Sequence, residues 1–239
     1  MIISALKSND SRDSRSPIHI DTIASLTSLG AEILFETEIG SGIYTSDDEF
    51  SDMGIQKVSR ETCFIKSDLV ISLQPPKEEE IDSMKSGSTI LGMMNPFYNQ
   101  ALLNHCAKKN INLVSMEFIP RITRAQKMDV LSSQANLAGY AAVIESANHL
   151  SNALPMMMTA AGTLKPAKVF VIGVGVAGLQ AIATAKRLGA RVEAFDTRDV
   201  VEEQVKSLGA KFVKIDLGET GETDQGYAKE LTPEQMRNK

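Results

Sequence analysis

The chain has no tryptophan, only two cysteines and no long apolar run, and each shortage excludes a class of protein. Cys63 and Cys106 are far apart and neither belongs to a CxxC motif. A disulfide framework and a zinc site are therefore excluded, no metal site is expected, and buried thiols in a reducing compartment are predicted. No segment approaches the roughly 18 apolar residues of a membrane-spanning helix. The apolar run at residues 1–7 is too short for a signal peptide.

A basic surface is also missing. The 239 residues carry 25 lysines and arginines against 30 aspartates and glutamates, which gives a formal net charge of −5 and an isoelectric point near 5.3. Nucleic-acid-binding domains show the opposite balance, so no nucleic-acid partner is expected. The length is sufficient for two domains, each with its own core.

Short apolar runs alternate with amphipathic stretches in the first half of the chain, which is typical of a parallel α/β sheet. The expected strands are residues 2–6, 32–36, 69–73, 89–93 and 112–116, and the expected helices lie near 17–29, 77–85 and 98–109. This half carries no GxGxxG motif. We therefore expect residues 1–131 to form an N-terminal α/β domain that binds no nucleotide.

An Ala- and Leu-rich pattern without interior proline predicts a long helix over residues 132–153, which Pro155 ends. The Met-rich residues 153–164 that follow are too few for a membrane anchor and are interpreted as packed core. Residues 132–164 are thus expected to link the first domain to a second one. The predicted fold class is α/β, with two Rossmann-like parallel-sheet domains joined by this long helix.

A glycine-rich turn dominates the second domain. An apolar strand over residues 169–172 leads into a GxGxxG motif formed by Gly173, Gly175 and Gly178. The first glycine permits the tight turn, the second lets the backbone approach a pyrophosphate, and the third lets the following helix pack close to the strand. Val176 and Ala177 begin that helix, whose free N–H groups attract phosphate.

An acid completes the pattern. Asp196 lies 23 residues after Gly173, at the end of the next strand, where a carboxylate can accept hydrogen bonds from the hydroxyls of an adenine ribose. It would repel a 2′-phosphate, so the sequence predicts NAD(H) and not NADP(H). Thr197 and Arg198 follow and are included among the cofactor-binding residues. Arg198 could accept a phosphate, although a solvated loop residue is the preferred interpretation.

Residues 165–239 are expected to supply only the first half of this NAD(H)-binding Rossmann domain. The pattern gives strands at 168–173, 191–196 and 211–215 with helices at 177–188 and 199–208, and then a polar, glycine-containing tail. A complete dinucleotide fold needs two such halves. Without the second half, one edge of the sheet is open. The chain is therefore interpreted as truncated or as one piece of a split protein.

Four segments together carry a resemblance to a known family. They are residues 120–134, residues 155–163, residues 173–189 and residues 226–230. They closely resemble the NAD(H)-binding component of proton-translocating nicotinamide nucleotide transhydrogenase, a family related to alanine dehydrogenase. From about Met116 onward the chain is similar to that family almost throughout.

By that resemblance, Arg121, Gln126 and Asp129 form the loop around the nicotinamide, with Ser132 beside them. Hydride transfer removes no proton from a heteroatom, so the protein needs only to fix the face and distance of the ring. Arg121 and Ser132 can hold the carboxamide, Gln126 can bridge toward a second nicotinamide, and Asp129 can orient Arg121 or the ribose. The alternative is that these are polar residues at a helix entry, with Asp129 and Ser132 as caps.

The resemblance implies the remaining functional expectations. Tyr227 would lie on a loop that closes over the nucleotide and excludes water, unless it is an ordinary surface aromatic. Hydride would pass directly from NADH to NADP held by a separate component, coupled to proton movement through a membrane proton-channel component. A homodimer is implied, located in the cytoplasm at the inner membrane, or on the matrix side of the mitochondrial membrane in a eukaryote.

Two other functions stay open. An alanine dehydrogenase-like enzyme needs a lysine or arginine and a histidine facing the cleft. The relevant strand ends instead read Leu73-Gln74-Pro75-Pro76 and Met93-Met94-Asn95-Pro96, and the three histidines, His19, His105 and His149, fall on expected helices. That absence favours a transhydrogenase. The second alternative is a truncated NAD-binding remnant without catalysis.

Overall fold

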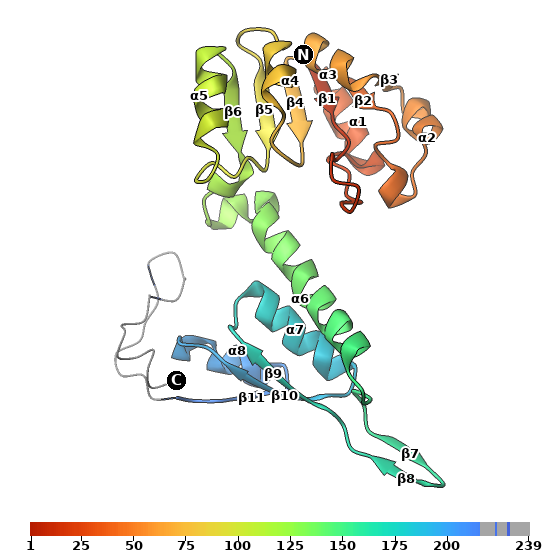
Figure 1. The fold of residues 1–239 in the computed structure, drawn as a ribbon, viewed down its shortest axis with the longest axis vertical. Coiled ribbons are helices and arrows are strands. Elements are labelled where there is room, and N and C mark those ends of the chain that lie inside the picture. The colour runs from red at the N-terminus through yellow and green to blue at the C-terminus, as the bar shows by residue number, and fades with distance from the viewer. Residues whose placement is uncertain (216–222, 224–228, 230–239) are drawn as a thin grey trace. The chain divides into compact units, whose positions relative to one another are not determined.

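The structure is a computed structural model that describes residues 1–215, 223 and 229 (Figure 1). The chain divides into two compact units, Met1–Pro120 and Arg121–Lys239, called unit 1 and unit 2 below. Among the described residues, no helix combines the length and the apolarity that a membrane crossing requires. Each unit is built on its own parallel sheet.

Unit 1 contains a six-stranded sheet in which all neighbouring strands are parallel. The strands are β1 Ile2–Ala5, β2 Glu32–Glu36, β3 Gln56–Val58, β4 Leu69–Ser72, β5 Thr89–Gly92 and β6 Asn112–Ser115. Their order is β3-β2-β1-β4-β5-β6. β1 to β3 are therefore added outward on one side, and after β3 the chain returns to the middle of the sheet, where β4 pairs with β1 and starts the other side. This is the order of a doubly wound fold.

Helices cover both faces of this sheet because alternate strand residues point to opposite sides. They are α1 Ile20–Ser28, α2 Asp47–Asp52, α3 Arg60–Lys66, α4 Glu78–Asp82 and α5 Gln100–Lys108, with short 3-10 turns at Ser41–Ile43 and Met116–Phe118. On one face Phe35 packs against Phe50 of α2, with ring centroids 5.4 Å apart. On the other face Val70 packs against Cys63 and Phe64 of α3.

The predicted α/β class is confirmed, and the five strands expected in this half are all present with ends within a residue of prediction. Three elements between β2 and β4 were not predicted, namely α2, β3 and α3. They are short, and β3 reads Gln-Lys-Val at the sheet edge, where no apolar alternation is required. A sequence signal for α2 does exist: Ser46 and Glu49 form a capping box at its start.

Unit 2 holds a three-stranded parallel sheet in the order β11-β10-β9. Its strands are β9 Lys168–Ile172, β10 Arg191–Phe195 and β11 Lys211–Phe212, and its helices are α6 Val130–His149, α7 Val176–Arg187 and α8 Glu202–Ser207, with 3-10 turns at Thr123–Met128 and Asp199–Val201. α6 lies along α7 (Figure 1). A shared core joins Val143 of α6, Ile182 of α7 and Val205 of α8 to the inner face of the sheet.

On the opposite face of this sheet, the side chains of β9 are exposed in the described part of the chain. Phe170 and Ile172 of β9 are 53% and 75% exposed, whereas their neighbours Val169 and Val171 pack against the core. β9 also lies at the edge of the sheet, paired only with β10 among the described residues. In the described part of the chain, β9 thus presents an unpaired edge and exposed apolar side chains.

The Met-rich segment after α6 forms a two-stranded antiparallel hairpin, β7 Met157–Thr159 and β8 Gly162–Leu164. Every residue from 156 to 165 is exposed. The interpretation of this segment as packed core is therefore wrong. An apolar composition favours burial, but it does not determine which segment covers the apolar side chains. Within residues 1–215, these two strands pair only with each other.

Candidate functional site

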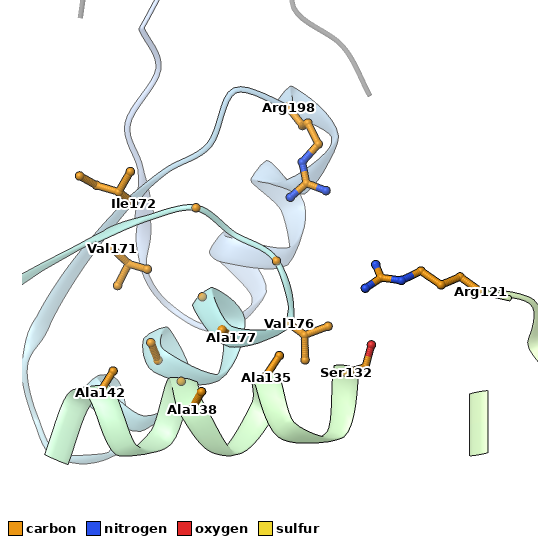
Figure 2. Close-up of a pocket in the computed structure, with 15 residues that line it drawn as sticks. Arg121, Ser132, Ala135, Ala138, Ala142, Val171, Ile172, Val176, Ala177 and Arg198 are labelled. Carbon is orange, nitrogen blue, oxygen red and sulfur yellow. The ribbon is translucent and has the colours of Figure 1, made fainter. Parts of the chain in front are cut away.

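A cavity of about 620 Å³ lies in unit 2 between α6 and the glycine turn (Figure 2). Its volume is in the range of ligand sites. The cavity brings together most of the residues that the sequence predicted, and its full lining is Arg121, Ser132, Ala135, Ala138, Gly139, Ala142, Val171, Ile172, Gly173, Gly175, Val176, Ala177, Gly178, Ala181 and Arg198.

The three glycines of the turn differ in backbone conformation and in the space around them. Gly173 has φ +91°, a left-handed conformation that other residues rarely adopt. Gly178 packs against the turn so closely that a Cβ there would collide with the carbonyl oxygen of Gly173. A Cβ on Gly175 would meet no atom within 4 Å, so the space above this residue is open.

That open space lies at the start of α7. Gly175 is the N-cap residue and has no side chain to cap the helix, so the first-turn N–H groups receive no side-chain acceptor. The macrodipole adds a partial positive charge at this end of a 12-residue helix. Val176, Ala177 and Gly178 line the cavity here. Such a helix start is suited to an anion such as a pyrophosphate.

Asp196 follows β10 and lies beside the turn, where it is almost completely buried. Its Oδ2 accepts a hydrogen bond from the Val174 N–H at 2.7 Å. The Arg198 side chain forms a two-pronged pair with it, Nε to Oδ1 at 2.9 Å and Nη2 to Oδ2 at 3.0 Å. The two side chains are 6% and 14% exposed. The interpretation of Arg198 as a solvated loop residue is therefore wrong, because the carboxylate draws the guanidinium inward.

The surroundings of Asp196 favour its ionised form. Burial by itself would raise the pKa of this carboxyl, but hydrogen bonds from the Arg198 side chain and from the Val174 and Arg198 amides outweigh burial, so the pKa lies below its ordinary value. Asp196 is therefore a carboxylate at neutral pH. A carboxylate accepts hydrogen bonds from hydroxyls and repels phosphate.

The predicted nicotinamide residues lie at the entry to α6. Asp129 is the N-cap of α6, and its carboxylate accepts from the Ser132 N–H at 2.9 Å and from Ser132 Oγ at 2.7 Å. These hydrogen bonds, with a further contribution from the charge of Arg121, lower the pKa of Asp129. The capping role considered for Asp129 is thus present. Ser132 and Arg121 both line the cavity, and Figure 2 shows the Arg121 guanidinium directed toward the region of Arg198.

Asp129 and Asp196 contact the lining residues Ser132 and Arg198 without lining the cavity themselves, and two further predicted residues also lie outside the lining. Gln126 is exposed in the 3-10 turn Thr123–Met128 and does not line the cavity. Thr197 is half-buried between Asp196 and Arg198. Tyr227 lies outside the described residues.

The sequence patterns considered above did not identify a wall of small residues on α6. Ala135, Ala138, Gly139 and Ala142 recur at helical spacing and line the cavity. A Cβ on Gly139 would collide with the carbonyl oxygen of Ala177, so the two helix backbones are in direct contact. The signal was available, because small residues three and four positions apart mark a helix face that approaches another backbone closely.

An amino-acid dehydrogenase would need cationic and polar side chains at the strand ends of unit 1, and here such side chains bond to other side chains of unit 1. At the end of β4, Gln74 Nε2 donates to Ser8 Oγ at 2.7 Å and to Asp13 Oδ2 at 3.2 Å. Arg15 pairs with the same Asp13 at 2.7 Å, and Lys7 pairs with Glu38 at 2.8 Å. Arg15 and Lys7 are therefore each paired with a carboxylate.

His105 and His149 lie on helices, as predicted, whereas His19 lies just before α1. His19 caps α1, and His105 and His149 each contact a helix carboxylate at 2.9 Å, Asp82 and Glu145 respectively. None of these positions is at the end of a strand of the described sheet.

Within the part of the chain that the structure describes, no cluster of histidine, cysteine and carboxylate side chains could hold a metal ion. Cys63 and Cys106 are buried free thiols, as predicted. Burial raises the pKa of the Cys63 thiol to about 11 and raises that of Cys106 as well. Both therefore remain protonated at neutral pH.

Comparison with known proteins matches both halves of the chain to one family. Residues 6–138 match the family model described as alanine dehydrogenase/PNT, N-terminal domain, and residues 142–238 match its C-terminal counterpart. The first portion of the split NAD(P) transhydrogenase subunit alpha from Rickettsia prowazekii is 44% identical over 236 residues, which cover 96% of this chain and 61% of that protein. The corresponding Rhodospirillum rubrum protein is 44% identical over 230 residues, covering 93% and 60%.

Solved structures agree. A transhydrogenase from Sinorhizobium meliloti has a TM-score of 0.86 at 44% identity, over 90% of this chain and 64% of that one. An L-alanine dehydrogenase has a TM-score of 0.80 at 20% identity, over 91% and 61%, which shows a shared fold. The chain spans 60–61% of the length of the two curated relatives named above, and 44% and 42% of the transhydrogenase alpha subunits from Haemophilus influenzae and Cereibacter sphaeroides.

Proposed function

The chain belongs to the alanine dehydrogenase/PNT family, and on that basis we propose that unit 2 binds NAD(H) and presents it for direct hydride transfer to NADP on a partner component of a proton-translocating transhydrogenase. One observation carries the proposal. A helix start suited to phosphate, a buried carboxylate beside it and the Arg121–Ser132 end of α6 all border or adjoin one cavity.

The cavity fits the parts of NAD(H) in sequence. The open space above Gly175 accommodates the pyrophosphate without a Cβ in its path, and the N–H groups of the first turn of α7 neutralise its charge. Asp196 lies beside that turn and is ionised, so it selects ribose hydroxyls over a 2′-phosphate. These features support NAD(H) as the cofactor.

The nicotinamide end is held by Arg121 and Ser132 in this proposal. Bound NADH supplies the hydride, and the task of the chain is to fix the orientation of the ring. Arg121 donates to the carboxamide oxygen, and Ser132 also binds the carboxamide. Asp129 accepts hydrogen bonds from the hydroxyl and the amide of Ser132 and so fixes its position. Gln126 is exposed, where its amide can reach toward a second nucleotide on another component.

Unit 1 offers a reason to prefer this function over an amino-acid dehydrogenase. Such an enzyme must bind a carboxylate substrate and move a proton. Arg15 and Lys7 already pair with Asp13 and Glu38, and Gln74 lies where the strand end could have provided a base. The described part of unit 1 thus gives an acid substrate little positive charge and no histidine at a strand end.

Other components are part of the proposal. Because the chain spans only part of the length of its transhydrogenase relatives, transhydrogenation is expected to need further components, namely an NADP(H)-binding component and a membrane proton channel. Tyr227 is proposed to close over the bound nucleotide. The open β9 edge and the exposed hairpin β7–β8 favour association, which supports a homodimer. A location in the cytoplasm beside the inner membrane, or on the matrix side in a eukaryote, follows from the same assignment.

A fluorescence titration tests the proposal. NADH is expected to bind and to change its emission, and NADPH is expected to bind far more weakly. With an NADP(H)-binding component from a related enzyme added, hydride transfer between the two nucleotides is expected, whereas NAD with alanine, or NADH with pyruvate and ammonia, is expected to give no turnover. No NADH binding at millimolar concentration would mean a remnant, and turnover with alanine would mean a dehydrogenase.

A further inference from the structure

Four hydrogen bonds converge on the carboxylate of Asp196. Oδ1 accepts from the backbone N–H and from Nε of Arg198, each at 2.9 Å. Oδ2 accepts from the Val174 N–H at 2.7 Å and from Nη2 of Arg198 at 3.0 Å. A carboxylate has about four lone-pair sites in all. These donors therefore fill it, and two of them belong to a single side chain.

A ribose can donate its hydroxyls to this carboxylate only if a present donor leaves. The amides of Val174 and Arg198 belong to the backbone of the turn and of the segment after β10, so they are held in place. The guanidinium of Arg198 is carried on a long side chain, lines the cavity, and has a second acceptor 3.3 Å away in the carbonyl oxygen of Val174. It is therefore the donor that can be exchanged, and Figure 2 shows its side chain at the cavity.

We propose that Arg198 is a specificity-determining residue of the nucleotide site. When nucleotide binds, the guanidinium releases the Asp196 carboxylate, which then accepts hydrogen bonds from the 2′- and 3′-hydroxyls of the adenosine ribose. The Asp196–Arg198 pair thereby selects a nucleotide with a 2′-hydroxyl over one with a 2′-phosphate. This inference rests on the proposed function, because it requires Asp196 to face the ribose of the bound nucleotide.

Charge explains the discrimination. A 2′-phosphate carries close to two negative charges at neutral pH. In the wild-type chain it would meet the Asp196 carboxylate, and the positive charge of Arg198 is already neutralised by the two-pronged pair. Without the carboxylate, the planar guanidinium fork would become a phosphate ligand at the same place. The Asp196 carboxylate thus disfavours a 2′-phosphate in two ways: it repels the phosphate, and its ion pair with Arg198 neutralises the guanidinium that could otherwise bind the phosphate.

The experiment compares four proteins: wild type, Asp196→Ala, Asp196→Ala/Arg198→Ala and, as a matched control for the other cavity arginine, Asp196→Ala/Arg121→Ala. Affinities for NADH and NADPH are measured by fluorescence, and those for 5′-AMP and 2′,5′-ADP by calorimetry. The last two ligands report on the ribose alone. In Asp196→Ala the ratio of 2′-phosphorylated to unphosphorylated affinity should rise about 10- to 100-fold, the effect of one or two charge-assisted hydrogen bonds.

The two double variants identify the residue responsible. Removing Arg198 should return the affinity ratio to near the wild-type value, whereas removing Arg121 should preserve the increase. If Asp196→Ala loses its thermal unfolding transition, Asp196→Asn replaces it, because an amide oxygen can still accept from the Val174 N–H. A purely structural role for Arg198 would weaken all ligands together and leave the ratio unchanged.

The possible failures are distinguishable. If wild type binds NADH but the ratio does not change in Asp196→Ala or Asp196→Asn, the inference about Arg198 is overturned and the proposed function stands. An increase that survives the loss of Arg198 but not the loss of Arg121 overturns it as well. A folded wild type that binds neither NADH nor 5′-AMP overturns both.

Discussion

Replacing Gly175 with alanine is expected to weaken NADH binding and to leave the fold of unit 2 intact. Gly175 has φ −82° and ψ −164°, which alanine adopts without strain, and its Cβ would meet no protein atom within 4 Å. The added methyl group would instead occupy the space assigned to the pyrophosphate. The substitution therefore separates ligand contact from protein packing.

The magnitudes follow from the same geometry. Alanine is a poorer N-cap than glycine, which costs about 0.5–1 kcal/mol, and it reduces the entropy of the unfolded chain, which contributes about 0.4–1 kcal/mol in the opposite direction. The free energy of unfolding should thus change by less than about 1 kcal/mol. Contact of the methyl group with a bound phosphate should cost about 1–3 kcal/mol, by analogy with an overpacked core, or roughly 5- to 150-fold in NADH affinity.

Gly178→Ala is the matched control. Its Cβ would collide with the carbonyl oxygen of Gly173, a backbone atom that cannot rotate away. Overpacking of about 1–3 kcal/mol outweighs the gain in helix propensity of about 1 kcal/mol, so this variant should lose both stability and NADH affinity.

Urea unfolding gives the stability, and NADH titration the affinity, of wild type, Gly175→Ala and Gly178→Ala. Wild-type NADH affinity in Gly175→Ala would refute the placement of the pyrophosphate. Destabilisation of Gly175→Ala equal to that of Gly178→Ala would refute the geometry of the turn.

Three further outcomes are expected. Asp196→Ala should weaken NADH binding by about 1–3 kcal/mol through lost charge-assisted hydrogen bonds, and unchanged affinity in a titration would contradict the assignment of this acid to the ribose. Gln126→Asn should slow hydride transfer to an NADP-binding component with little change in NADH affinity, and a large affinity loss would count against its bridging role. The folded-state pKa of Asp196 is lowered, so its contribution to stability is present above the ordinary aspartate pKa and is lost as pH falls toward the lower folded value. Urea unfolding between pH 7 and pH 3 should therefore show a shallower acid decline in Asp196→Asn, and parallel curves would contradict this.

Local patterns explain which regions of the site could be predicted from sequence. The positive φ of Gly173 and the close approach of Gly178 are consequences of a short motif whose geometry is set within a few residues. The strands of unit 1 were found because buried parallel strands are almost continuously apolar. The edge strand β3 lacks that requirement, and no apolar signal distinguished it.

The features that were missed depend on contacts between segments distant in the chain or on solvent exposure. Whether Arg198 points to solvent or to Asp196 is decided by how the segment after β10 folds back on the turn, which composition does not encode. The exposed methionines around Met158 illustrate the same limit, because apolarity alone does not specify a neighbour. Asp129 was foreseen both as a cap and as a site residue, and the capping bonds to Ser132 are compatible with either role.

The backbone contact between Gly139 and Ala177 fixes the position of α6 against α7. Ser132 and Gly139 lie on one helix, so the rise of about 1.5 Å and the rotation of about 100° per residue set the distance and the angle between these two positions on the cavity wall. A substitution between these positions changes only a side chain, whereas an inserted or deleted residue would turn Ser132 away from the cavity. The number of residues in this stretch of helix is therefore more tightly constrained than their identity.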